Sequence, residues 1–188
     1  MTTRASSLRS PEVQEALLSA FAGESMAQSR YRAYAEVARR EGYVNLARIF
    51  EGIAFAEQIH ARNHLGASEQ TSYPQRACAG TPTRLGTTSS NLELAIAGEL
   101  YEVNTMYPSF IGLARERGDE EAARTFSLAL EAERVHASIY KWAKEHVDRG
   151  QDVPLEGVWI CEGCGHTHLG RTPPAKCPLC GSERYLSF

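Results

Sequence analysis

Two pairs of acidic and imidazole side chains recur in the chain at the same spacing. Glu57 and His60 lie three residues apart in FAEQIHA, and Glu133 and His136 repeat the pattern in ALEAERVHA. Residues three apart share one face of a helix about one turn apart, so both side chains of a pair can bind the same metal ions. One such pair is weak evidence, because Glu-x-x-His is common on exposed helix faces. Two pairs in one chain indicate a metal centre.

Three more glutamates extend this pattern. Glu24 precedes the first pair and Glu99 precedes the second at nearly the same interval, and Glu102 follows Glu99 by about one helical turn. The two halves of the sequence therefore echo each other. This repetition predicts a site with approximate twofold symmetry. Each half would contribute one helix with a lone glutamate and one helix with a Glu-x-x-His pair.

Apolar residues at spacings of three and four predict the helices that carry these side chains. The periodic segments span about residues 11–41, 45–65, 90–118 and 120–148. In each segment the acids and imidazoles fall on the apolar stripe itself, so we expect them to face inward. Ser10 before Pro11 is typical of a helix start, and Gly42 is typical of a helix end.

Five carboxylates buried together would be strongly unfavourable, because each ionised carboxylate loses its hydration and like charges repel. Cations must therefore sit among them, and two divalent or trivalent metal ions would supply the charge. One Glu from each of two helices plus Glu-x-x-His from each of the other two is the ligand set of ferritin-like di-iron bundles. The sequence thus predicts an all-α four-helix bundle, ferritin-like in fold, with a dinuclear metal centre.

The connection between the second and third helices, at about residues 66–90, is rich in Gly, Pro, Ser and Thr. Its length predicts a crossover between bundle helices rather than a tight hairpin. Cys78 lies in this segment and is expected to be an ordinary thiol. Pro108 lies inside the third helix, where it should remove the hydrogen bond to the Asn104 carbonyl and bend the helix.

A second type of metal site is predicted at the C-terminus. The tail WICEGCG…PPAKCPLCG contains two Cys-x-x-Cys knuckles, formed by Cys161, Cys164, Cys177 and Cys180. Four thiolates favour tetrahedral coordination of one ion, and they suit zinc as well as iron. Residues 157–188 hold too few apolar side chains to fold without such an ion. We therefore expect residues 1–148 to form the bundle, 149–156 a linker, and 157–188 a small metal-binding domain of short β-strands and loops.

Composition excludes several other classes of protein. The chain has 188 residues, a net charge of −3 and 43% hydrophobic residues, which offers no general attraction to nucleic acid or anionic membranes. It contains no apolar run of bilayer length, and its N-terminal segment lacks the apolar core of a secretory signal. We expect a cytoplasmic location, where clustered cysteines bind metal rather than form disulfides.

The motifs together resemble the rubrerythrin family over nearly the whole chain. They are GESMAQSRYRAYAEVAR, FAEQIHA, AIAGELYEVNTMYPSF, ALEAERVHA and the rubredoxin-like tail. The resemblance implies a non-haem di-iron peroxidase that reduces hydrogen peroxide to water in oxidative-stress defence. Electrons would pass through one iron in the Fe(Cys)4 tail, which zinc can occupy in recombinant protein. An external rubredoxin or NAD(P)H-dependent reductase would supply them.

The same resemblance implies a role for each ligand. Glu57 and Glu133 would bridge the two irons. Glu24 would bind one iron, and Glu99 and His136 the other. A homodimer is also implied, in which the tail of one subunit lies close to the bundle of the other.

A change of ligand is implied for the iron bound by Glu24. In such proteins this iron exchanges a glutamate for a histidine on reduction, and these residues map onto Glu102 and His60. Tyr31 and Tyr107 would donate hydrogen bonds to ligating carboxylates and fix their orientation. The alternative for Tyr31 is a purely aromatic role in the core.

Two other functions compete with the peroxidase. A ferroxidase or iron-storage protein of the ferritin type would use the same bundle, but it has no need of a separate electron-entry site. A non-enzymatic protein with structural zinc in the tail is the second alternative. Seven inward metal-binding side chains oppose it, because a purely structural core would be more stable with apolar residues.

Overall fold

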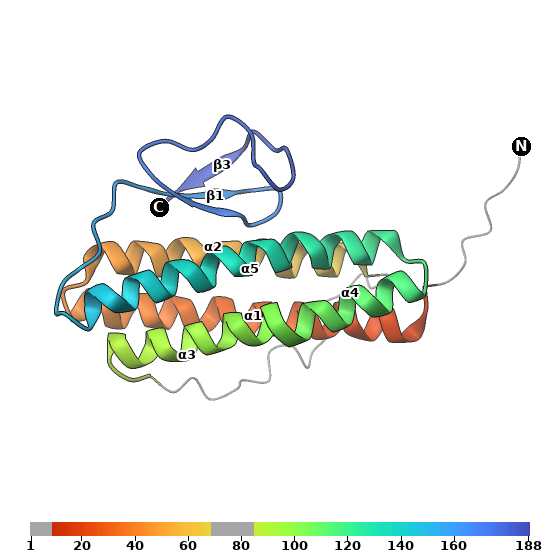
Figure 1. Ribbon diagram of the computed structural model, residues 1–188, viewed down its shortest axis with the longest axis horizontal. Helices are drawn as coiled ribbons and strands as arrows, with labels where there is room; N and C mark the ends of the chain where they lie inside the picture. Colours follow the sequence, from red (N-terminus) through yellow and green to blue (C-terminus); the bar gives the residue numbers. More distant parts are fainter. Residues whose placement is uncertain (1–8, 69–84) are drawn as a thin grey trace, which may run out of the picture.

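The computed structural model describes residues 9–68 and 85–188, and its main body is a bundle of four long helical rods (Figure 1). The rods are built from α1 (Pro11–Arg40), α2 (Val44–Ala67), α3 (Thr88–Tyr101), the π-helix η2 (Glu102–Met106), α4 (Tyr107–Glu116) and α5 (Glu120–Val147). The elements α3, η2 and α4 follow one another without a break and form the third rod. The predicted four-helix bundle is confirmed.

Local signals determine where these helices begin and end. The Ser10 hydroxyl accepts a hydrogen bond from the Val13 amide at 3.2 Å, and Pro11 begins α1. Gly42 follows the C-terminal end of α1. Its φ of +92° is a left-handed conformation that glycine adopts without steric cost. Asp119 caps α5 by accepting a hydrogen bond from the Ala122 amide at 3.0 Å. The helix boundaries therefore lie close to those predicted from the sequence.

The third rod is not the continuous helix that the periodicity predicts. The Tyr107 amide donates a hydrogen bond to the Glu102 carbonyl five residues earlier, which makes η2 a π turn. Pro108 follows at the start of α4 and has no amide hydrogen, so the predicted bend takes the form of this wide turn. Residues five apart stack in a π turn. Both Glu102 and Tyr107 consequently reach the interior, where both are buried.

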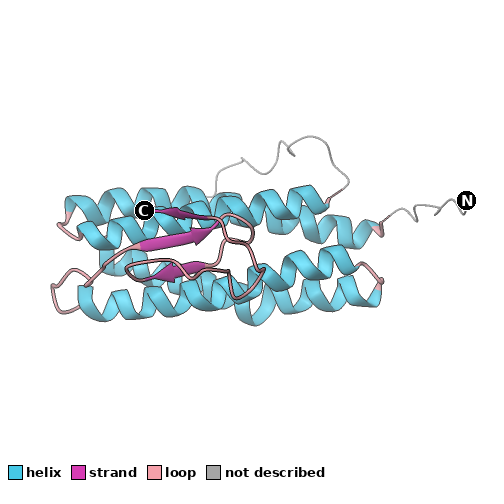
Figure 2. Cartoon of the chain, turned by 90° about the horizontal axis from the view of Figure 1, so that it is seen from above, coloured by secondary structure: helices cyan, strands magenta, loops and turns pink. Residues whose placement is uncertain are grey.

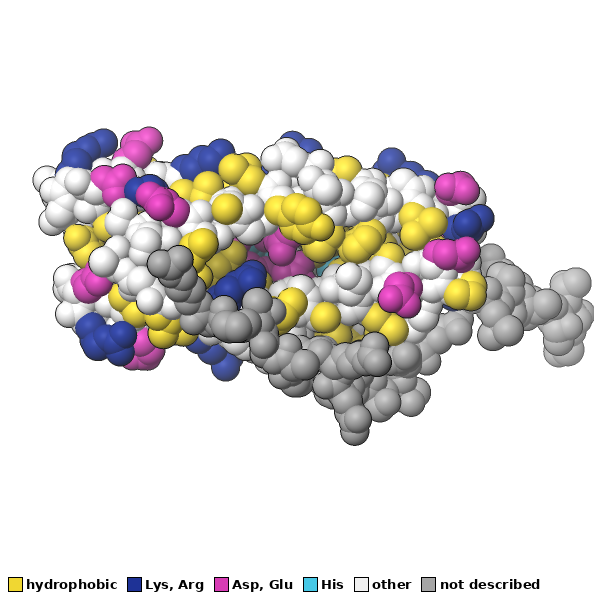
Figure 3. Space-filling model, turned by 90° about the horizontal axis from the view of Figure 1, so that it is seen from below, with side chains coloured by type: hydrophobic (Ala, Val, Ile, Leu, Met, Phe, Trp, Pro, Cys, Tyr) yellow, Lys and Arg dark blue, Asp and Glu magenta, His cyan; other side chains and the backbone are white. Residues whose placement is uncertain are grey.

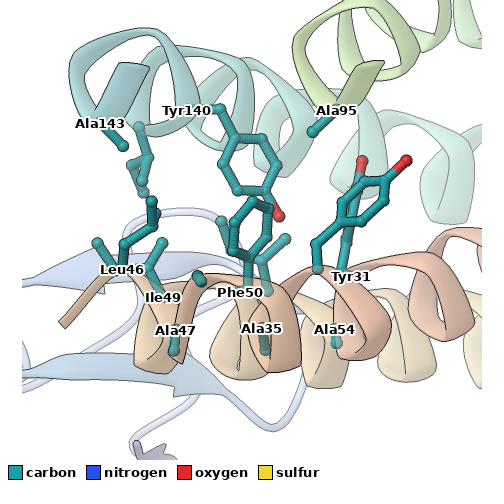
Figure 4. Close-up of a cluster of buried hydrophobic side chains, with 14 of the residues drawn as sticks. Tyr31, Ala35, Leu46, Ala47, Ile49, Phe50, Ala54, Ala95, Tyr140 and Ala143 are labelled. Carbon is teal, nitrogen blue, oxygen red and sulfur yellow. The ribbon is translucent and has the colours of Figure 1, made fainter. Parts of the chain in front are cut away.

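Apolar clusters fill the bundle. Tyr31, Phe50 and Tyr140 belong to a cluster in which ring centroids lie 5.1 Å apart for Phe50 and Tyr140 and 5.3 Å apart for Tyr31 and Tyr140 (Figure 4). A second cluster contains Leu17 and Phe126. Each large side chain buried in this way contributes about 1.5–3 kcal/mol. The rods therefore have a substantial source of stability apart from any metal.

The C-terminal residues form a small antiparallel sheet of three strands, β1 (Val158–Cys161), β2 (Thr167–Leu169) and β3 (Tyr185–Ser187), in the order β2-β1-β3. Figure 2 shows the sheet lying over the helices, with its strands running nearly along them. A Cβ added to Gly52 of α2 would lie 2.7 Å from Val158 Cγ1, so the strand packs where the helix has no side chain. The predicted small domain of short strands is confirmed.

The segment between α5 and β1 is anchored to the bundle. The Asp152 carboxylate accepts hydrogen bonds from the Asn45 and Leu46 amides at 2.8 and 3.1 Å, and the Asn45 side chain donates to the Val153 carbonyl. Tyr43 at the N-cap position of α2 makes no side-chain capping bond. Asp152, which lies between α5 and β1, therefore caps the N-terminus of α2.

This anchor bears on the expected contact between subunits. The resemblance implied that the tail lies against the bundle of a second subunit, but here it lies against the bundle of its own chain. The ten residues between Val147 and Val158 could span at most about 35 Å, which is enough to return the tail to α2 and α5. The tail therefore contacts the bundle of its own chain, while the homodimer, with the tail of one subunit close to the bundle of the other, stays a prediction.

Two further predictions fall near the limits of the described residues. Cys78 and most of the crossover segment lie outside them. Within residues 9–68 and 85–188, no helix combines the length and apolarity that a membrane span requires.

Candidate metal centres

The seven predicted ligands of the dinuclear centre come together in the interior of the bundle. All are buried, and they are Glu24, Glu57, His60, Glu99, Glu102, Glu133 and His136. Each of the four rods contributes at least one of them. The inward orientation inferred from the apolar stripes is correct for every one of these residues.

Six of the seven side chains form two overlapping groups, in which the potential ligand atoms lie within 4.8 Å of one another. The members are Glu24, Glu57, His60 and Glu133 in one group, and Glu57, Glu99, Glu133 and His136 in the other. Glu57 and Glu133 belong to both groups, so two neighbouring ions could share their carboxylates. Glu102 belongs to neither group. Of the two residues expected to exchange on the Glu24 side, only His60 is therefore grouped with Glu24.

The small domain orients both histidines. His60 Nε2 lies 3.0 Å from the Cys164 carbonyl oxygen, and because a carbonyl only accepts, this nitrogen carries the proton. His136 Nε2 lies 2.9 Å from the Thr167 hydroxyl. In both rings the other nitrogen, Nδ1, faces the carboxylates, 2.8 Å from Glu57 Oε2 for His60 and 2.7 Å from Glu133 Oε2 for His136. The outer contacts therefore leave Nδ1 available for a metal ion.

The carboxylates show a deficit that metal ions would fill. Two buried oxygens, Glu24 Oε2 and Glu99 Oε2, accept no hydrogen bond from the described residues, and two more, Glu57 Oε1 and Glu133 Oε1, face only an imidazole Nδ1, at 3.2 and 2.7 Å. A buried acceptor without a partner costs about 1–3 kcal/mol, and more when it is charged. Four converging carboxylates whose inner oxygens meet no donor other than the two imidazoles fit a pair of cations lying among them. The residues present therefore fit a di-iron centre.

The electrostatics of the cluster point the same way. Burial raises the pKa of Glu24, Glu99 and Glu102 well above the usual range, and neighbouring carboxylates raise it further. Burial would lower the pKa of His136, but Glu57 and Glu133 outweigh it and raise the value to about 9. Without metal the cluster must hold protons to limit its negative charge. Metal ions would take the place of those protons.

Both predicted tyrosines contact carboxylates of the cluster. The Tyr31 hydroxyl donates to Glu99 Oε1 at 2.5 Å, and the Tyr107 hydroxyl donates to Glu24 Oε1. Burial and the adjacent carboxylates raise the pKa of both hydroxyls well above the usual value. Each tyrosine therefore stays protonated and donates to one oxygen, which leaves the other carboxylate oxygen free for a metal ion.

The four cysteines of the small domain also converge. Cys161 and Cys180 sulfurs lie 3.5 Å apart, and Cys164 and Cys177 sulfurs lie 3.6 Å apart. A disulfide needs about 2.05 Å, whereas four sulfurs at about 2.3 Å from one ion would be about 3.8 Å apart. The spacing fits tetrahedral coordination. Three of these cysteines are buried, and Cys180 is the most accessible of them.

Some residues of the site were not found from the sequence. The Cys164 carbonyl and the Thr167 hydroxyl have no sequence signature, because their roles depend on where the tail packs. His64 belongs to no Glu-x-x-His pair, but it is fully buried, with Nε2 3.0 Å from the Tyr107 hydroxyl. Its position four residues after His60, on the same helix face, was the available signal.

The face of the bundle opposite the small domain approaches the acidic centre. Figure 3 shows acidic side chains in a hollow between apolar ones on this side. Glu102 is the least buried of the five clustered glutamates, with 7% of its surface exposed. Arg30 is the cation whose charge partly offsets the effect of burial on the pKa of Glu102. The centre is thus covered by the small domain on one side and is closest to solvent at Glu102 on the other.

A four-helix bundle with a buried carboxylate and histidine centre, joined to a four-cysteine domain, defines a ferritin-like protein with a rubredoxin-like domain. The chain belongs to the rubrerythrin family. A family model described as rubrerythrin matches residues 15–144, and a model described as the rubredoxin-like domain of rubrerythrin matches residues 159–185. The centre in the bundle corresponds to the di-iron site of this family, and the four cysteines correspond to its rubredoxin-like site.

Individual relatives agree with this assignment. Rubrerythrin-2 of Clostridium acetobutylicum is 37% identical over 178 residues, which cover 95% of this chain and 96% of the relative. Rubrerythrin of Nitratidesulfovibrio vulgaris is 34% identical over 180 residues, 95% of this chain and 94% of the relative. A mixed-valence structure of nigerythrin is 32% identical, with a TM-score of 0.82 over all of this chain and 92% of that one.

More distant structures share only the fold. Bacterioferritin of Mycobacterium tuberculosis is 22% identical, with a TM-score of 0.66 over 76% of this chain and 89% of that one. The likeness supports the ferritin-like bundle and says nothing about the tail.

Proposed function

We propose that this protein is a peroxidase that reduces hydrogen peroxide to water at the di-iron site. Electrons enter through the iron of the four-cysteine site. The hydrogen bond between His60 Nε2 and the Cys164 carbonyl carries this proposal, because it joins a backbone group of one metal site to a predicted ligand of the other. An electron donor site built against a dinuclear centre fits a reductase of peroxide better than an iron store.

The geometry supports distinct roles for the ligands. Glu57 and Glu133 lie between the two groups and would bridge the irons. Glu24 would hold one iron and Glu99 the other, together with His136. We also propose that Glu102 and His60 alternate as ligands on the Glu24 side, since both are buried beside it and only His60 belongs to its group.

Two ferrous ions bound here would supply the two electrons that peroxide needs, together with positive charge near the oxygen atoms. The chain itself positions these ions and restricts water. Tyr31 and Tyr107 hold Glu99 and Glu24 in fixed orientations, and the small domain holds the two imidazoles. Because these side chains are held in place, an exchange of Glu102 for His60 would shift the ion rather than the imidazole, with Glu102, at the exposed edge, as the adjustable carboxylate.

Electrons would reach the tail near Cys180. This cysteine lines a groove of about 790 Å³ between the small domain, α2 and α5. Three arginines line the same groove, namely Arg62, Arg124 and Arg184. Their positive charge favours an acidic electron carrier, such as an external rubredoxin or an NAD(P)H-dependent reductase with an acidic surface. An anionic donor placed here would lie next to the most accessible thiolate.

Stopped-flow reoxidation of reduced, iron-quantified protein tests the proposal. Peroxide should reoxidise the reduced protein much faster than O2 does. The four-cysteine iron should be oxidised after the di-iron site, because it supplies electrons to that site. The opposite order of oxidants would favour the ferroxidase, and a tail that binds only zinc under iron-replete expression would favour the structural alternative.

A further inference from the structure

A line of hydrogen-bonding groups leads from the groove to the dinuclear centre. Thr125 of α5 lines the groove, and its hydroxyl lies 3.3 Å from His64 Nδ1. His64 Nε2 lies 3.0 Å from the Tyr107 hydroxyl, which contacts Glu24. These three side chains come from three different rods. They form a continuous path through the apolar second cluster, where His64 packs on Phe126.

The chemistry of the groups fixes the direction of every bond in this line. A metal-bound Glu24 is ionised and can only accept, so the single Tyr107 proton must point at it. The Tyr107 oxygen must then accept from His64, which places the ring proton on Nε2. His64 is neutral, because burial lowers its pKa to about 3. Its Nδ1 is therefore an acceptor, and the Thr125 hydroxyl donates to it.

We propose that Thr125, His64 and Tyr107 form a proton relay that supplies the dinuclear centre from the groove. The relay rests on the proposed function, because reduction of peroxide to two waters consumes two electrons and two protons. Each proton passed from Tyr107 towards Glu24 is replaced from His64 Nε2. His64 in turn gains a proton at Nδ1 from Thr125, and Thr125 gains one from water in the groove. One proton moves inward, and no group keeps a net charge. His64 is left as the Nδ1–H tautomer, so it must exchange protons with solvent and regain the Nε2–H form before the second proton can follow.

The relay has a signature that does not depend on activity. Zinc-loaded protein is diamagnetic, and nitrogen-15 spectra of its imidazoles report which nitrogen carries the proton. We expect His64 as the Nε2–H tautomer at neutral pH. In Tyr107→Phe the His64 Nε2 resonance should shift, because its acceptor is gone. A Nδ1–H tautomer in the unmodified protein would overturn the proposal, whether or not the protein reduces peroxide.

Kinetics separate a relay from simple packing. His64→Ala should slow peroxide reoxidation roughly a hundredfold, the usual range for losing a positioned proton donor, and free imidazole should restore much of the rate. His64→Phe should remain slow with imidazole, because its ring fills the site without a donor. Thr125→Val should show a smaller loss, since groove water can approach His64 directly.

Ser127→Ala is the matched control on the same helix. Its hydroxyl donates to the Ala123 carbonyl and belongs to no path towards the centre, so the rate should not change. Equal rates in His64→Phe and the unmodified protein would overturn the relay. So would a slow His64→Ala variant of normal iron content that imidazole fails to restore.

Discussion

The two metal sites are held in opposite ways. The bundle has long helices and two apolar clusters, so its rods position the carboxylates and imidazoles before any ion arrives. The small domain buries little besides Val158, Ile160 and three of its own cysteines. In the bundle the fold organises the ions, and in the tail the ion organises the fold. The first kind of site can survive metal loss, whereas the second cannot.

Removing the metal from the tail should have the largest effect. Cys161→Ser combined with Cys177→Ser should unfold the small domain while the helices persist, since structural metal in such small domains contributes about 10–16 kcal/mol. Trp159 reports on the tail and Trp142 on α5, so fluorescence in a Trp142→Phe background isolates the tail. Far-ultraviolet circular dichroism follows the helices. Simultaneous loss of both signals would break the contrast between the two sites.

Disrupting the dinuclear centre should release its metal ions and leave the helical bundle folded. Glu133 belongs to both ligand groups, so Glu133→Ala should release both bundle irons and leave the cysteine-bound iron in place. The helical signal should remain, with a loss of thermal stability that reflects the lost binding energy. Glu131→Ala removes an exposed carboxylate on the same helix and serves as the control. Iron quantification decides the outcome, and retention of both bundle irons would contradict the shared-ligand role.

The contact between the sites can be broken without touching a ligand. A Cβ on Gly165 would lie 2.3 Å from His60 Nε2, whereas one on Gly181 would meet no atom within 4 Å. Both glycines have similar left-handed φ angles, +78° and +76°, so alanine should cost about 1–2 kcal/mol at either position. Only Gly165→Ala should also slow electron transfer from the tail to the bundle.

The readout is the rate at which the cysteine-bound iron is oxidised after a peroxide pulse. Normal metal content in both variants is the condition for comparing them. Equal rates in Gly165→Ala and Gly181→Ala would show that the contact at His60 is not the electron path.

The smallest effect concerns the linker. Asp152→Ala removes the cap of α2 and should cost about 1 kcal/mol, measured by chemical denaturation. Because the same side chain anchors the tail, hydrogen exchange in β1 should accelerate more than exchange in α5. Glu156→Ala, an exposed neighbour, is the control. Unchanged exchange in β1 would mean that the tail is held by its own contacts alone.

Much of this arrangement was predictable from the sequence, because it depends on short-range periodicity. Glu57 and His60 are three residues apart on an apolar stripe, and their burial follows from the same helix that buries Ile53. The two cysteine knuckles carry their own ligand spacing. In both cases the chemistry and its position are encoded within one element.

The rest depends on long-range packing, which periodicity does not report. Pro108 signals an irregular helix, but it does not indicate that a π turn would bring Glu102 and Tyr107 to the same side. The orienting partners of the histidines come from residues more than thirty positions away in the chain, and one of them is a backbone carbonyl. A carbonyl is present at every residue, so no residue type could have revealed it.

The position of the orienting groups has a consequence for biosynthesis. Cys164 and Thr167 leave the ribosome after all of the helices that carry the carboxylates and imidazoles. A nascent bundle can therefore collapse, yet its two histidines lack their hydrogen-bonding partners until translation is almost finished. Maturation of the oxidising centre would then await completion of the electron-donating one, so that iron is not installed in a polypeptide unable to recycle it.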